Sequence, residues 1–452
     1  MSANMNEYKR KLISAEKAAQ LVKSGDLVAY GEFGIPPYDF DIALGNRVDE
    51  LKDVTVHACG SVRTWQIVKN DPEGEVFTLI LDHFSALDRV LGDRGRAVYS
   101  PVNYHDFHRM RLELHQPFSQ KDVICITTTP MDAYGNFNYG LCNSDTYAQL
   151  TNAKIVIVEA NPNMPYCLGG AMEYININDV DYIIESQAPI FTMPPAQAPS
   201  EAEIKIAENI LPLIPNGACL QLGIGGIPNT IGNLLAESDL RDLGIHTEMY
   251  CDAFTELYEA GKITNKHKTR DKGRSTYTFC FGNQKTHEFL HNNPLLASYD
   301  CDYTNNPKNI QLENNMISIN NCVEVDLLTQ VTSETSGLRQ ISGTGGALDF
   351  HIGAFESQGG KGILAFESTY EDKNGKLHSR INPVLAPGSV VTVPRTLVHY
   401  IATEWGVVNM KMRSAWGRAE QMINLAHPYF RDDLLKSAKE LGLWSRTNRI
   451  PY

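Results

Sequence analysis

Two segments of the chain repeat one pattern, and this repeat constrains the fold more than any other feature of the sequence. SGDLVAYGEFGIP at residues 24–36 aligns without gaps with NGACLQLGIGGIP at residues 216–228. In both copies an apolar, β-rich run follows a helical pattern and leads through a glycine-containing turn into another helical pattern. The identical positions are Gly25, Gly31, Gly34, Ile35 and Pro36 in the first copy, and Gly217, Gly223, Gly226, Ile227 and Pro228 in the second. The repeat favours two related halves over the alternative, a chance likeness between two glycine-rich turns.

Short apolar runs alternate with helical patterns along most of the chain. They lie at residues 26–30, 122–129, 154–161, 182–186 and 218–223. Strands of a parallel sheet are buried on both faces, and they therefore have such continuous apolar sequences. The sequence predicts an α/β fold with two related open α/β domains, produced by an internal duplication, that face each other across an active-site cleft.

A proline-rich segment separates the two halves. TMPPAQAPS at residues 192–200 contains Pro194, Pro195 and Pro199 and no charged residue, so it continues neither a helix nor a central strand. We therefore predict an N-terminal domain at residues 1–193, a linker at 194–200 and a C-terminal domain at 201–452. Ser14 and Ser200 each precede a helical pattern as candidate N-caps.

Charge and hydropathy exclude two classes of partner. The chain has 40 Lys and Arg residues against 53 Asp and Glu residues, a net charge of −13. Such a surface repels polyphosphate backbones, so we expect no nucleic-acid binding, and an anionic ligand needs a locally built pocket. No apolar run approaches the roughly 18 residues of a membrane helix, and the N-terminus has a charged amphipathic pattern without a secretory apolar core. We expect a cytoplasmic protein that does not insert into membranes.

The cysteines and histidines do not form a metal-site pattern. Nine cysteines are an odd number, and they are scattered without a C-x-x-C pair. His105 and His108 are three residues apart, but no third ligand of suitable spacing lies near them in the sequence. We expect reduced, mostly buried thiols and no bound metal.

Two glycine-rich segments are candidate ligand loops. GIGGIPNTIG at residues 223–232 follows a strand pattern and opens a helical one, but Pro228 stands where a dinucleotide fingerprint needs glycine, and no phosphate-loop Gly-Lys-Ser/Thr is present. Glycines still let a ligand approach the backbone, and a helix N-terminus offers N–H groups to an anion. SGTGGALDF at residues 342–350 has the same character. For both loops the alternative is a tight strand-to-helix turn without a ligand.

Among the carboxylates, Glu248 occupies the most informative position. It follows an apolar strand pattern that ends at His246, and ligands gather at the carboxyl ends of strands in α/β sheets. The chain has no G-x-S-x-G elbow, which removes the commonest serine-hydrolase route, and no H-E-x-x-H motif. From the residues alone, a single glutamate is more often solvated or paired with a cation than catalytic.

A series of motifs in a fixed order gives the chain a resemblance to one family. They are TTTPMDAYGNFNYG (127–140), ANPNMP (160–165), QLGIGGIPN (221–229), GIHTEMYCDAFTELYEAGKITN (244–265), FCFGNQKTHEFLHNNP (279–294), ISINNCVEVDLLTQV (317–331), SGTGGALDF (342–350) and AHPYFRDDL (426–434). On these motifs, which span almost the full chain, it resembles the acetyl-CoA hydrolase/transferase family of class I coenzyme A transferases. That group contains 4-hydroxybutyrate and butyrate–acetate CoA-transferases.

The resemblance implies roles for individual residues. Glu248, in the H-T-E segment of the C-terminal domain, falls on the family's nucleophile. The N-terminal turn with Gly34, Ile35 and Pro36 is the counterpart of the turn that lines the acyl pocket. The coenzyme A contacts that the resemblance implies are Gly223, Ile224, Gly225, Gly226, Ile227, Asn320, Gly345, Gly346 and Lys361.

The resemblance also implies an activity. It is the transfer of CoA between a short-chain acyl-CoA, either butyryl-CoA or 4-hydroxybutyryl-CoA, and acetate, by a ping-pong mechanism through a glutamyl-CoA thioester. CoA is then a substrate, no cofactor is tightly bound, and a homo-oligomer is expected. Two alternatives stay open: hydrolysis of acyl-CoA by the same glutamate, and a CoA-binding protein without turnover.

Overall fold

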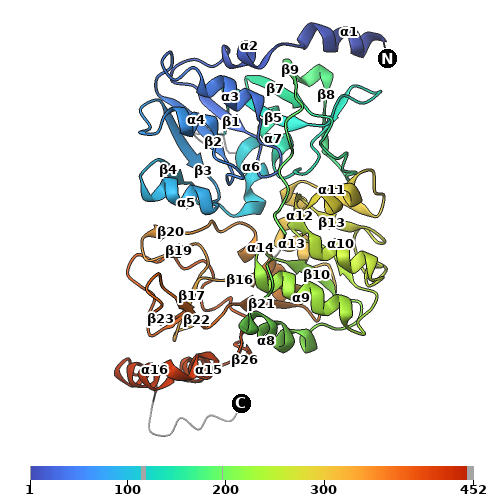
Figure 1. Cartoon of the computed structure of the whole chain (residues 1–452). Coiled ribbons are helices and arrows are strands. Elements are labelled where there is room, and N and C mark those ends of the chain that lie inside the picture. The colour runs from blue at the N-terminus through green and yellow to red at the C-terminus, as the bar shows by residue number, and fades with distance from the viewer. Residues whose placement is uncertain (1, 114–118, 196, 445–452) are drawn as a thin grey trace. The chain divides into compact units, whose positions relative to one another are not determined.

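The chain divides into two compact units, and each unit combines segments that are separated in the sequence. The computed structural model describes residues 2–113, 119–195 and 197–444 (Figure 1). The first unit comprises Met1–Pro194, Thr247–Asp252 and Arg274–Asn305, and the second unit comprises Pro195–His246, Ala253–Gly273 and Asn306–Tyr452. The first boundary falls between Pro194 and Pro195, within the predicted linker at 194–200. The predicted domain at 201–452 differs from the structure, because the segment that carries Glu248 belongs to the first unit.

A sheet of parallel strands forms the centre of the first unit. Its order is β4 (Ala97–Tyr99), β3 (Phe77–Leu81), β2 (Val54–Ala58), β1 (Leu27–Tyr30), β5 (Val123–Thr128), β7 (Ile155–Ala160) and β9 (Tyr182–Glu185). Every residue of β5 is buried, as its continuous apolar sequence predicts. The strand runs expected at 26–30, 122–129, 154–161 and 182–186 are thereby confirmed.

Short helices and a pair of short antiparallel strands accompany this sheet. They are α1 (Ser2–Lys11), α2 (Ala15–Ala19), α3 (Asp39–Gly45), α4 (Gln66–Asn70), α5 (Ala86–Asp93), η1 (Tyr104–Asp106), α6 (Phe107–Leu112), β6 (Asn136–Asn138), α7 (Thr146–Thr151), β8 (Tyr174–Asn176) and η2 (Ile177–Asp179). Helices α2, α3 and α4 pack against one another in succession (Figure 1). The predicted cap is confirmed, since the Ser14 hydroxyl accepts a hydrogen bond from the backbone N–H of Lys17 at the start of α2.

The later segments of the first unit build two small parallel sheets beside which Glu248 stands. Strand β12 (Met249–Cys251) pairs with β14 (Phe279–Phe281), and β13 (Ser275–Tyr277) pairs with β15 (Leu296–Ser298). Helices α11 (Gln284–Leu290) and α12 (Cys301–Asn305) complete these segments. An isolated bridge between Cys142 and Phe279 joins them to the earlier part of the unit.

The second unit contains a sheet of the order β11 (Gly244–Ile245), β10 (Cys219–Leu222), β16 (Met316–Asn321), β21 (Lys361–Ala365), β25 (Tyr400–Thr403) and β26 (Gly406–Asn409). Only the edge strand β26 is antiparallel within this sheet. The helices of the unit are α8 (Glu201–Ile210), η3 (Leu211–Leu213), α9 (Gly226–Glu237), α10 (Asp252–Glu259), α13 (Pro307–Ile310), α14 (Ala347–Glu356), α15 (Ala415–Leu425) and α16 (Pro428–Glu440). Short strands flank the sheet: β17 (Glu324–Asp326), β18 (Val331–Thr332), β19 (Thr335–Ser336), β20 (Arg339–Gln340), β22 (Thr369–Glu371), β23 (Leu377–Ser379) and β24 (Ile381–Asn382).

The two sheets share one strand order. In the first unit the order β2-β1-β5-β7-β9 runs through the sheet, and in the second the order is β11-β10-β16-β21-β25. Strands β1 and β10, which begin the two copies of the repeated segment, therefore hold the same place in their sheets. This agrees with the predicted internal duplication. That the domains face each other across a cleft stays a prediction.

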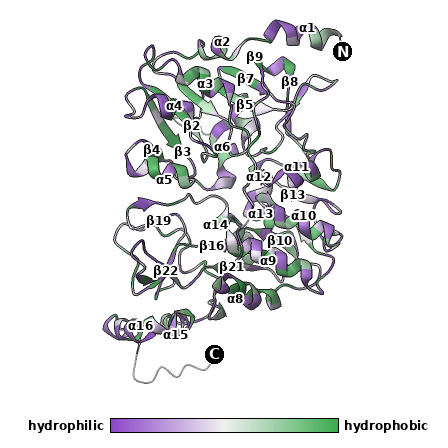
Figure 2. Cartoon of the chain, in the orientation of Figure 1, coloured by the Kyte–Doolittle hydropathy of each residue, from purple (hydrophilic) through white to green (hydrophobic). Residues whose placement is uncertain are grey.

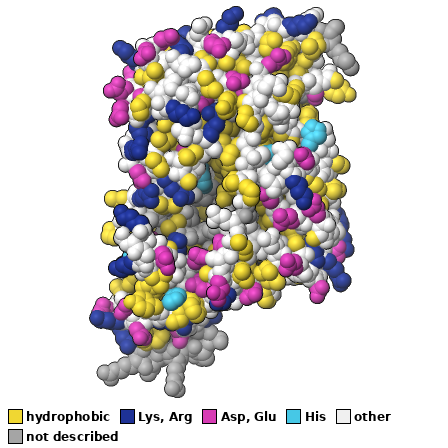
Figure 3. Space-filling view, in the orientation of Figure 1, with side chains coloured by type: hydrophobic (Ala, Val, Ile, Leu, Met, Phe, Trp, Pro, Cys, Tyr) yellow, Lys and Arg dark blue, Asp and Glu magenta, His cyan; other side chains and the backbone are white. Residues whose placement is uncertain are grey.

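Each unit has its own apolar core. The core of the first unit gathers around β1, β2, β3 and β5, and Figure 2 shows hydrophobic colouring along strands such as β3. The core of the second unit joins β21 and β25 to helix α15. All nine cysteines are buried free thiols, as expected. None of the described helices has the length and hydropathy of a membrane span. Acidic and basic side chains are interspersed over the face shown in Figure 3.

Candidate active site

Backbone hydrogen bonds fix the short segment that carries Glu248. Glu248 precedes β12, and its carbonyl oxygen accepts hydrogen bonds from the backbone N–H groups of Thr278 (3.0 Å) and Phe279 (3.3 Å). The residue itself is half-buried. The backbone at Glu248 is therefore fixed by the neighbouring strand, while its side chain keeps partial access to solvent.

One side chain orients the Glu248 carboxylate. The Nδ2 amide of Asn305, the last residue of α12, donates a hydrogen bond of 2.5 Å to Oε2 of Glu248. Asn305 is fully buried, and its Oδ1 accepts no hydrogen bond from the described part of the chain. A buried amide with one unused oxygen is costly, so the placement of Asn305 beside Glu248 points to a function for the pair. The local sequence of Asn305 gives no sign of this contact.

An aromatic cluster lies next to the Glu248 segment. The ring of Phe33 stacks on that of Phe279 with centroids 4.3 Å apart, and Phe281 packs edge-on against both at 5.5 Å. The ring of Tyr104 lies 6.1 Å from that of Phe279. Because Phe279 also donates its backbone N–H to the carbonyl of Glu248, the cluster forms an apolar wall beside the Glu248 segment.

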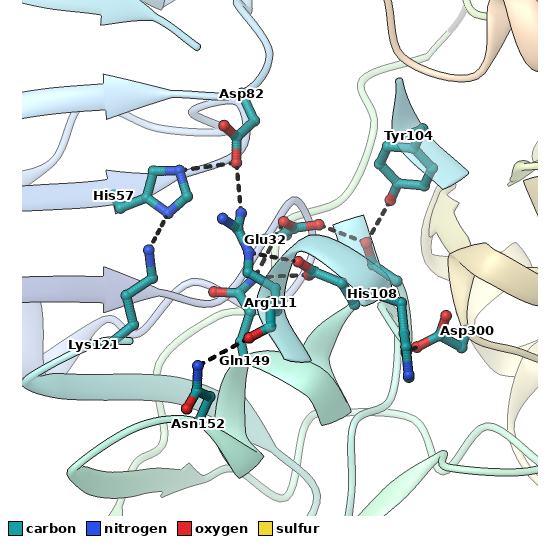
Figure 4. A network of polar contacts seen from close by, with 12 residues as sticks. Glu32, His57, Asp82, Tyr104, His108, Arg111, Lys121, Gln149, Asn152 and Asp300 are labelled. Carbon is teal, nitrogen blue, oxygen red and sulfur yellow. Dashed lines mark hydrogen bonds and ion pairs between the residues drawn. The ribbon is translucent and has the colours of Figure 1, made fainter. Parts of the chain in front are cut away.

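Behind this wall lies a network of buried polar groups, which Figure 4 shows. The hydroxyl of Ser144 donates to Oε2 of Glu32 (2.6 Å) and lies 2.7 Å from the hydroxyl of Tyr104. Gln149 Nε2 donates to Oε1 of Glu32 at 3.2 Å. Burial raises the pKa of Glu32 well above its usual range, and the nearby carboxylate of Asp145 raises it further. Glu32 is thus a structural group of the interior.

The network continues into a buried ion cluster. Arg111 contacts Asp82 at 2.9 Å and Asp145 at 3.1 Å, and His57 contacts Asp82 at 2.9 Å (Figure 4). Lys121 Nζ lies 2.7 Å from Nδ1 of His57. Burial acts to raise the pKa of Asp82, but electrostatic attraction and hydrogen bonding from His57, together with the charge of Arg111, hold it at about 2. Asp82 is therefore charged at neutral pH and balances Arg111.

The predicted glycine turn of the first unit lies close to the aromatic cluster. A Cβ on Gly34 would approach the Cβ of Leu141 to 2.8 Å and the carbonyl oxygen of Cys280 to 3.8 Å, so the turn packs tightly against Leu141 and lies beside β14, the strand that contains Phe279. Ile35 is fully buried, while Pro36 is half-buried and its carbonyl accepts from Thr127 Oγ1.

In the second unit, the structure brings Gly223 and Asn320 together at the carboxyl edge of the sheet. Gly223 follows β10, and a Cβ there would meet Oδ1 of Asn320 at 2.8 Å. Gly225 has a φ of 125°, where glycine is favoured, and Gly226 begins helix α9. The Asn321 side chain donates to the carbonyl of Ile224 at 2.8 Å. In the loop that also contains Ile227, neighbouring side chains pack against the glycines: a Cβ on Gly225 would meet Nδ2 of Asn321, and a Cβ on Gly226 would meet Oε1 of Glu203.

The second glycine loop opens another helix of the same unit. Gly345 has a φ of 51°, and Gly346 is the N-cap residue of α14. Thr344, which precedes them, lies within hydrogen-bond distance of both carboxylate oxygens of Glu334 (3.3 and 3.2 Å). Both predicted loops therefore present helix N-termini.

Comparison with known proteins decides the family. The chain matches the acetyl-CoA hydrolase/transferase N-terminal domain at residues 2–194 and the C-terminal domain of the same family at residues 282–438. The chain belongs to the acetyl-CoA hydrolase/transferase family. It is 44% identical to butyryl-CoA:acetate CoA-transferase of Anaerostipes caccae, over 98% of this chain and 99% of that protein. It is 38% identical to 4-hydroxybutyrate coenzyme A transferase of Clostridium kluyveri, over 96% and 98%. The crystal structure of RipA from Yersinia pestis superimposes with a TM-score of 0.88 at 34% identity, covering 98% of this chain and 100% of that one.

Within this acetyl-CoA hydrolase/transferase fold, Lys361 lies away from the other predicted coenzyme A contacts. It begins β21 opposite Ile317, whereas Asn320 pairs with Leu364 further along the same strand. With a rise of about 3.3 Å per residue, Lys361 stands at the amino edge of the sheet and the glycine loops at the carboxyl edge. The structure therefore does not bring Lys361 to the loops of Gly223 and Asn320.

The histidine pair that resembled a metal site has a different partner. His108 Nδ1 lies 2.6 Å from Asp300, and His105 lies 3.4 Å from Asp106. No cluster of three or more metal-ligating side chains occurs within the described ranges. The hydrogen bond to Asp300 raises the pKa of His108 above its usual value. His108 thus fastens α6 to the segment before α12.

The free energy of unfolding of the protein is expected to fall on acidification below about pH 6.5. Burial lowers the pKa of His57 to about 4 and that of His351 to about 3. The unfolded chain binds a proton at each histidine near pH 6.5 while the folded chain does not, so unfolding takes up protons and is favoured as pH falls towards about 4. His57 contributes at most about 3 kcal/mol to this loss.

Urea unfolding midpoints measured across this interval test the expectation. A His57→Gln variant should lose part of the pH dependence, since its side chain no longer titrates. An unfolding midpoint that is the same at both ends of the interval would show that these histidines are not held neutral.

Proposed function

We propose that the protein transfers coenzyme A from a short-chain acyl-CoA, butyryl-CoA or 4-hydroxybutyryl-CoA, to acetate, with Glu248 as the nucleophile. The observation that carries this proposal is the Glu248 carboxylate, held at one oxygen by the buried Asn305 amide. The apolar wall of Phe33, Phe279 and Phe281 supports a short aliphatic acyl group as the substrate. The names of the relatives above, which act on butyryl-CoA, 4-hydroxybutyrate and acetate, support the same substrate class.

The first half-reaction forms two successive covalent species on Glu248. An oxygen of the carboxylate bonds to the acyl carbonyl carbon and the carbon–sulfur bond breaks, which gives a mixed anhydride and CoA thiolate. The thiolate then bonds to the glutamyl carbonyl carbon, and the donor acid leaves as its carboxylate. The product is a glutamyl-CoA thioester, as in ping-pong nucleophilic catalysis.

The second half-reaction reverses these steps with acetate. Acetate attacks the glutamyl carbonyl and releases the thiolate, which takes the acetyl group from the resulting anhydride and restores the Glu248 carboxylate. A mixed anhydride is close enough in energy to a thioester for both directions to run. A glutamate with an ordinary pKa of about 4.3 is ionised at neutral pH, and such a nucleophile needs no general base.

Asn305 fits this chemistry as the group that orients the nucleophile. Its Nδ2 donates to Oε2 of Glu248 and so restrains the carboxylate at one of its oxygens. A hydrogen bond at 2.5 Å between a buried amide and a half-buried carboxylate holds one rotamer and reduces the conformations that must be searched before attack.

We further propose that the glycine loops of the second unit contact CoA through their backbone N–H groups. The residues are Gly223, Ile224, Gly225, Gly226, Ile227, Asn320, Gly345 and Gly346. N–H groups at a helix N-terminus are suited to bind the anionic groups of such a ligand. CoA is in this account a substrate. A cytoplasmic location, argued from the sequence, and a homo-oligomer, argued from the family resemblance, remain part of the proposal.

Replacement of Asn305 by alanine is expected to lower kcat by about 10²-fold, because Glu248 loses the donor that fixes its rotamer. The KM for acyl-CoA should change by less than about threefold. Asn138→Ala is the matched control, since Asn138 is a fully buried asparagine of the same unit whose amide bonds to the carbonyl of Cys167. Steady-state kinetics per folded enzyme should show the kcat loss for Asn305→Ala only; equal losses in both variants would make Asn305 a structural residue.

An assay of CoA release with and without acetate tests the function. Butyryl-CoA is supplied, and acetyl-CoA and free CoA are measured separately. The proposal predicts acetyl-CoA formation that requires acetate and little free CoA. Release of free CoA at a rate unaffected by acetate would instead establish acyl-CoA hydrolysis, and binding of CoA without either product would leave a CoA-binding protein without turnover.

A further inference from the structure

Ser144 has a backbone conformation that serine rarely adopts. Its φ is 43°, in the left-handed region that favours glycine, and the residue is fully buried. Such a conformation is strained and persists only where the surrounding contacts determine it. The contacts of Ser144 therefore show what the conformation serves.

The backbone of Ser144 touches both elements that fix Glu248. Its N–H donates to Oγ1 and to the carbonyl oxygen of Thr278, at 3.0 and 3.3 Å, and Thr278 in turn donates its N–H to the carbonyl of Glu248. The carbonyl of Ser144 accepts from the N–H of Cys301 at 2.9 Å. Cys301 begins α12, the helix that ends in Asn305.

The side chain of Ser144 is tied into the buried network on the other side. Its hydroxyl donates to Glu32 and accepts from Tyr104, and Glu32 is held in addition by Gln149 (Figure 4). The Tyr104 ring packs against Phe279 of the aromatic wall. Ser144 thus connects Glu32 and the apolar wall with the two segments that hydrogen-bond to Glu248.

We propose that Ser144 is a positioning residue for Glu248, and that its hydroxyl, bridged between Glu32 and Tyr104, holds the backbone contacts that set the place of Glu248 and Asn305. This inference rests on the proposed function, because it presumes that Glu248 is the group that attacks. Misplacement of a reacting group by about 1 Å can cost about 10²-fold in rate, so a residue that touches neither substrate nor Glu248 can still govern kcat.

The Ser144→Gly variant separates the effect of the hydroxyl from the effect of the backbone conformation. Glycine adopts a φ of 43° without strain, so the contacts to Thr278 and Cys301 can persist while the bridge to Glu32 and Tyr104 is lost. We expect kcat to fall by about 10- to 100-fold, with the KM for acyl-CoA changed by less than about threefold. Covalent labelling of Glu248 during turnover should slow by the same factor.

Two further variants keep the test decisive. Tyr104→Phe removes only the hydroxyl that donates to Ser144, and it should lower kcat in the same direction if Ser144→Gly does not fold. Asp71→Asn is the structural control, since the buried Asp71 carboxylate accepts four backbone N–H groups, from Gly74, Glu75, Val76 and Phe77, and should lower the unfolding midpoint without changing kcat.

The outcomes distinguish this inference from the proposed function. Unchanged kcat and unchanged Glu248 labelling in Ser144→Gly, or in Tyr104→Phe if that is the variant that folds, would overturn the positioning role while Glu248 remains the nucleophile. A kcat loss that Asp71→Asn reproduces in full would also overturn it. Failure of wild-type enzyme to carry a label on Glu248 would instead refute the proposed function.

Discussion

Glu248→Ala is expected to lower the rate of CoA transfer by at least about 10⁴-fold, because the variant has no atom that can form the acyl and thioester bonds. Glu248→Gln should be equally inactive, although its side chain has nearly the same shape and still accepts from Asn305. Glu248→Asp should retain more activity than either, but it draws the carboxylate back by one methylene and so should lose about 10²-fold. The measurement is acetyl-CoA formation from butyryl-CoA and acetate.

The control for these variants is Glu7→Gln, which makes the same change of charge on helix α1. Glu7 is paired with Arg10 and Lys11, and nothing places it near Glu248. Its variant should keep the wild-type rate. Activity of Glu248→Gln within about tenfold of wild type would be incompatible with a covalent glutamyl intermediate.

Arg111→Met is expected to give the largest loss of stability, about 3–5 kcal/mol. Arg111 is only 5% exposed and bridges two carboxylates that are themselves buried, Asp82 and Asp145. Removal of the guanidinium takes away the cation that both buried carboxylates contact. Since a whole domain is stable by only about 5–15 kcal/mol, much of the variant should be unfolded or insoluble. Urea or thermal unfolding provides the measurement.

A matched arginine on the same helix controls for the loss of a surface charge. Arg109 pairs with Glu113, and both side chains are exposed, so Arg109→Met should cost less than about 1 kcal/mol. Adding Asp82→Asn and Asp145→Asn to Arg111→Met should restore part of the lost stability, because the uncompensated charges are removed. Equal unfolding midpoints for the Arg111 and Arg109 variants would show that the buried cluster does not stabilise the fold.

The sequence was sufficient for the features that depend on local pattern. Continuous apolar runs located β1, β5, β7, β9 and β10, because buried parallel strands need apolar residues on both faces. The repeat around Gly31 and Gly223 anticipated two sheets with one strand order. The proline-rich segment located the boundary at Pro194.

Features that depend on distant contacts were missed. Nothing in the sequence around Asn305 distinguishes it from the neighbouring asparagines, and its role rests on a contact with Glu248 that only the folded chain creates. Glu32 and Ser144 are likewise more than a hundred residues apart in the chain. Nothing in the local sequence shows that the segments at 247–252 and 274–305 belong to the first unit, because that assignment depends on tertiary packing. Lys361 was predicted as a coenzyme A contact from its sequence motif alone. Its position at the start of β21 separates it from the glycine loops.

Trapping the enzyme during turnover tests the covalent role of Glu248 most directly. Wild-type protein is incubated with butyryl-CoA and then treated with borohydride, which reduces a glutamyl thioester to a primary alcohol, and the peptides are mapped by mass spectrometry. We predict that the modification lies on Glu248, requires acyl-CoA and disappears when acetate is added before the reductant in excess over butyryl-CoA. Modification of another residue, or an unmodified Glu248 peptide while acetyl-CoA forms at the normal rate, would contradict the account.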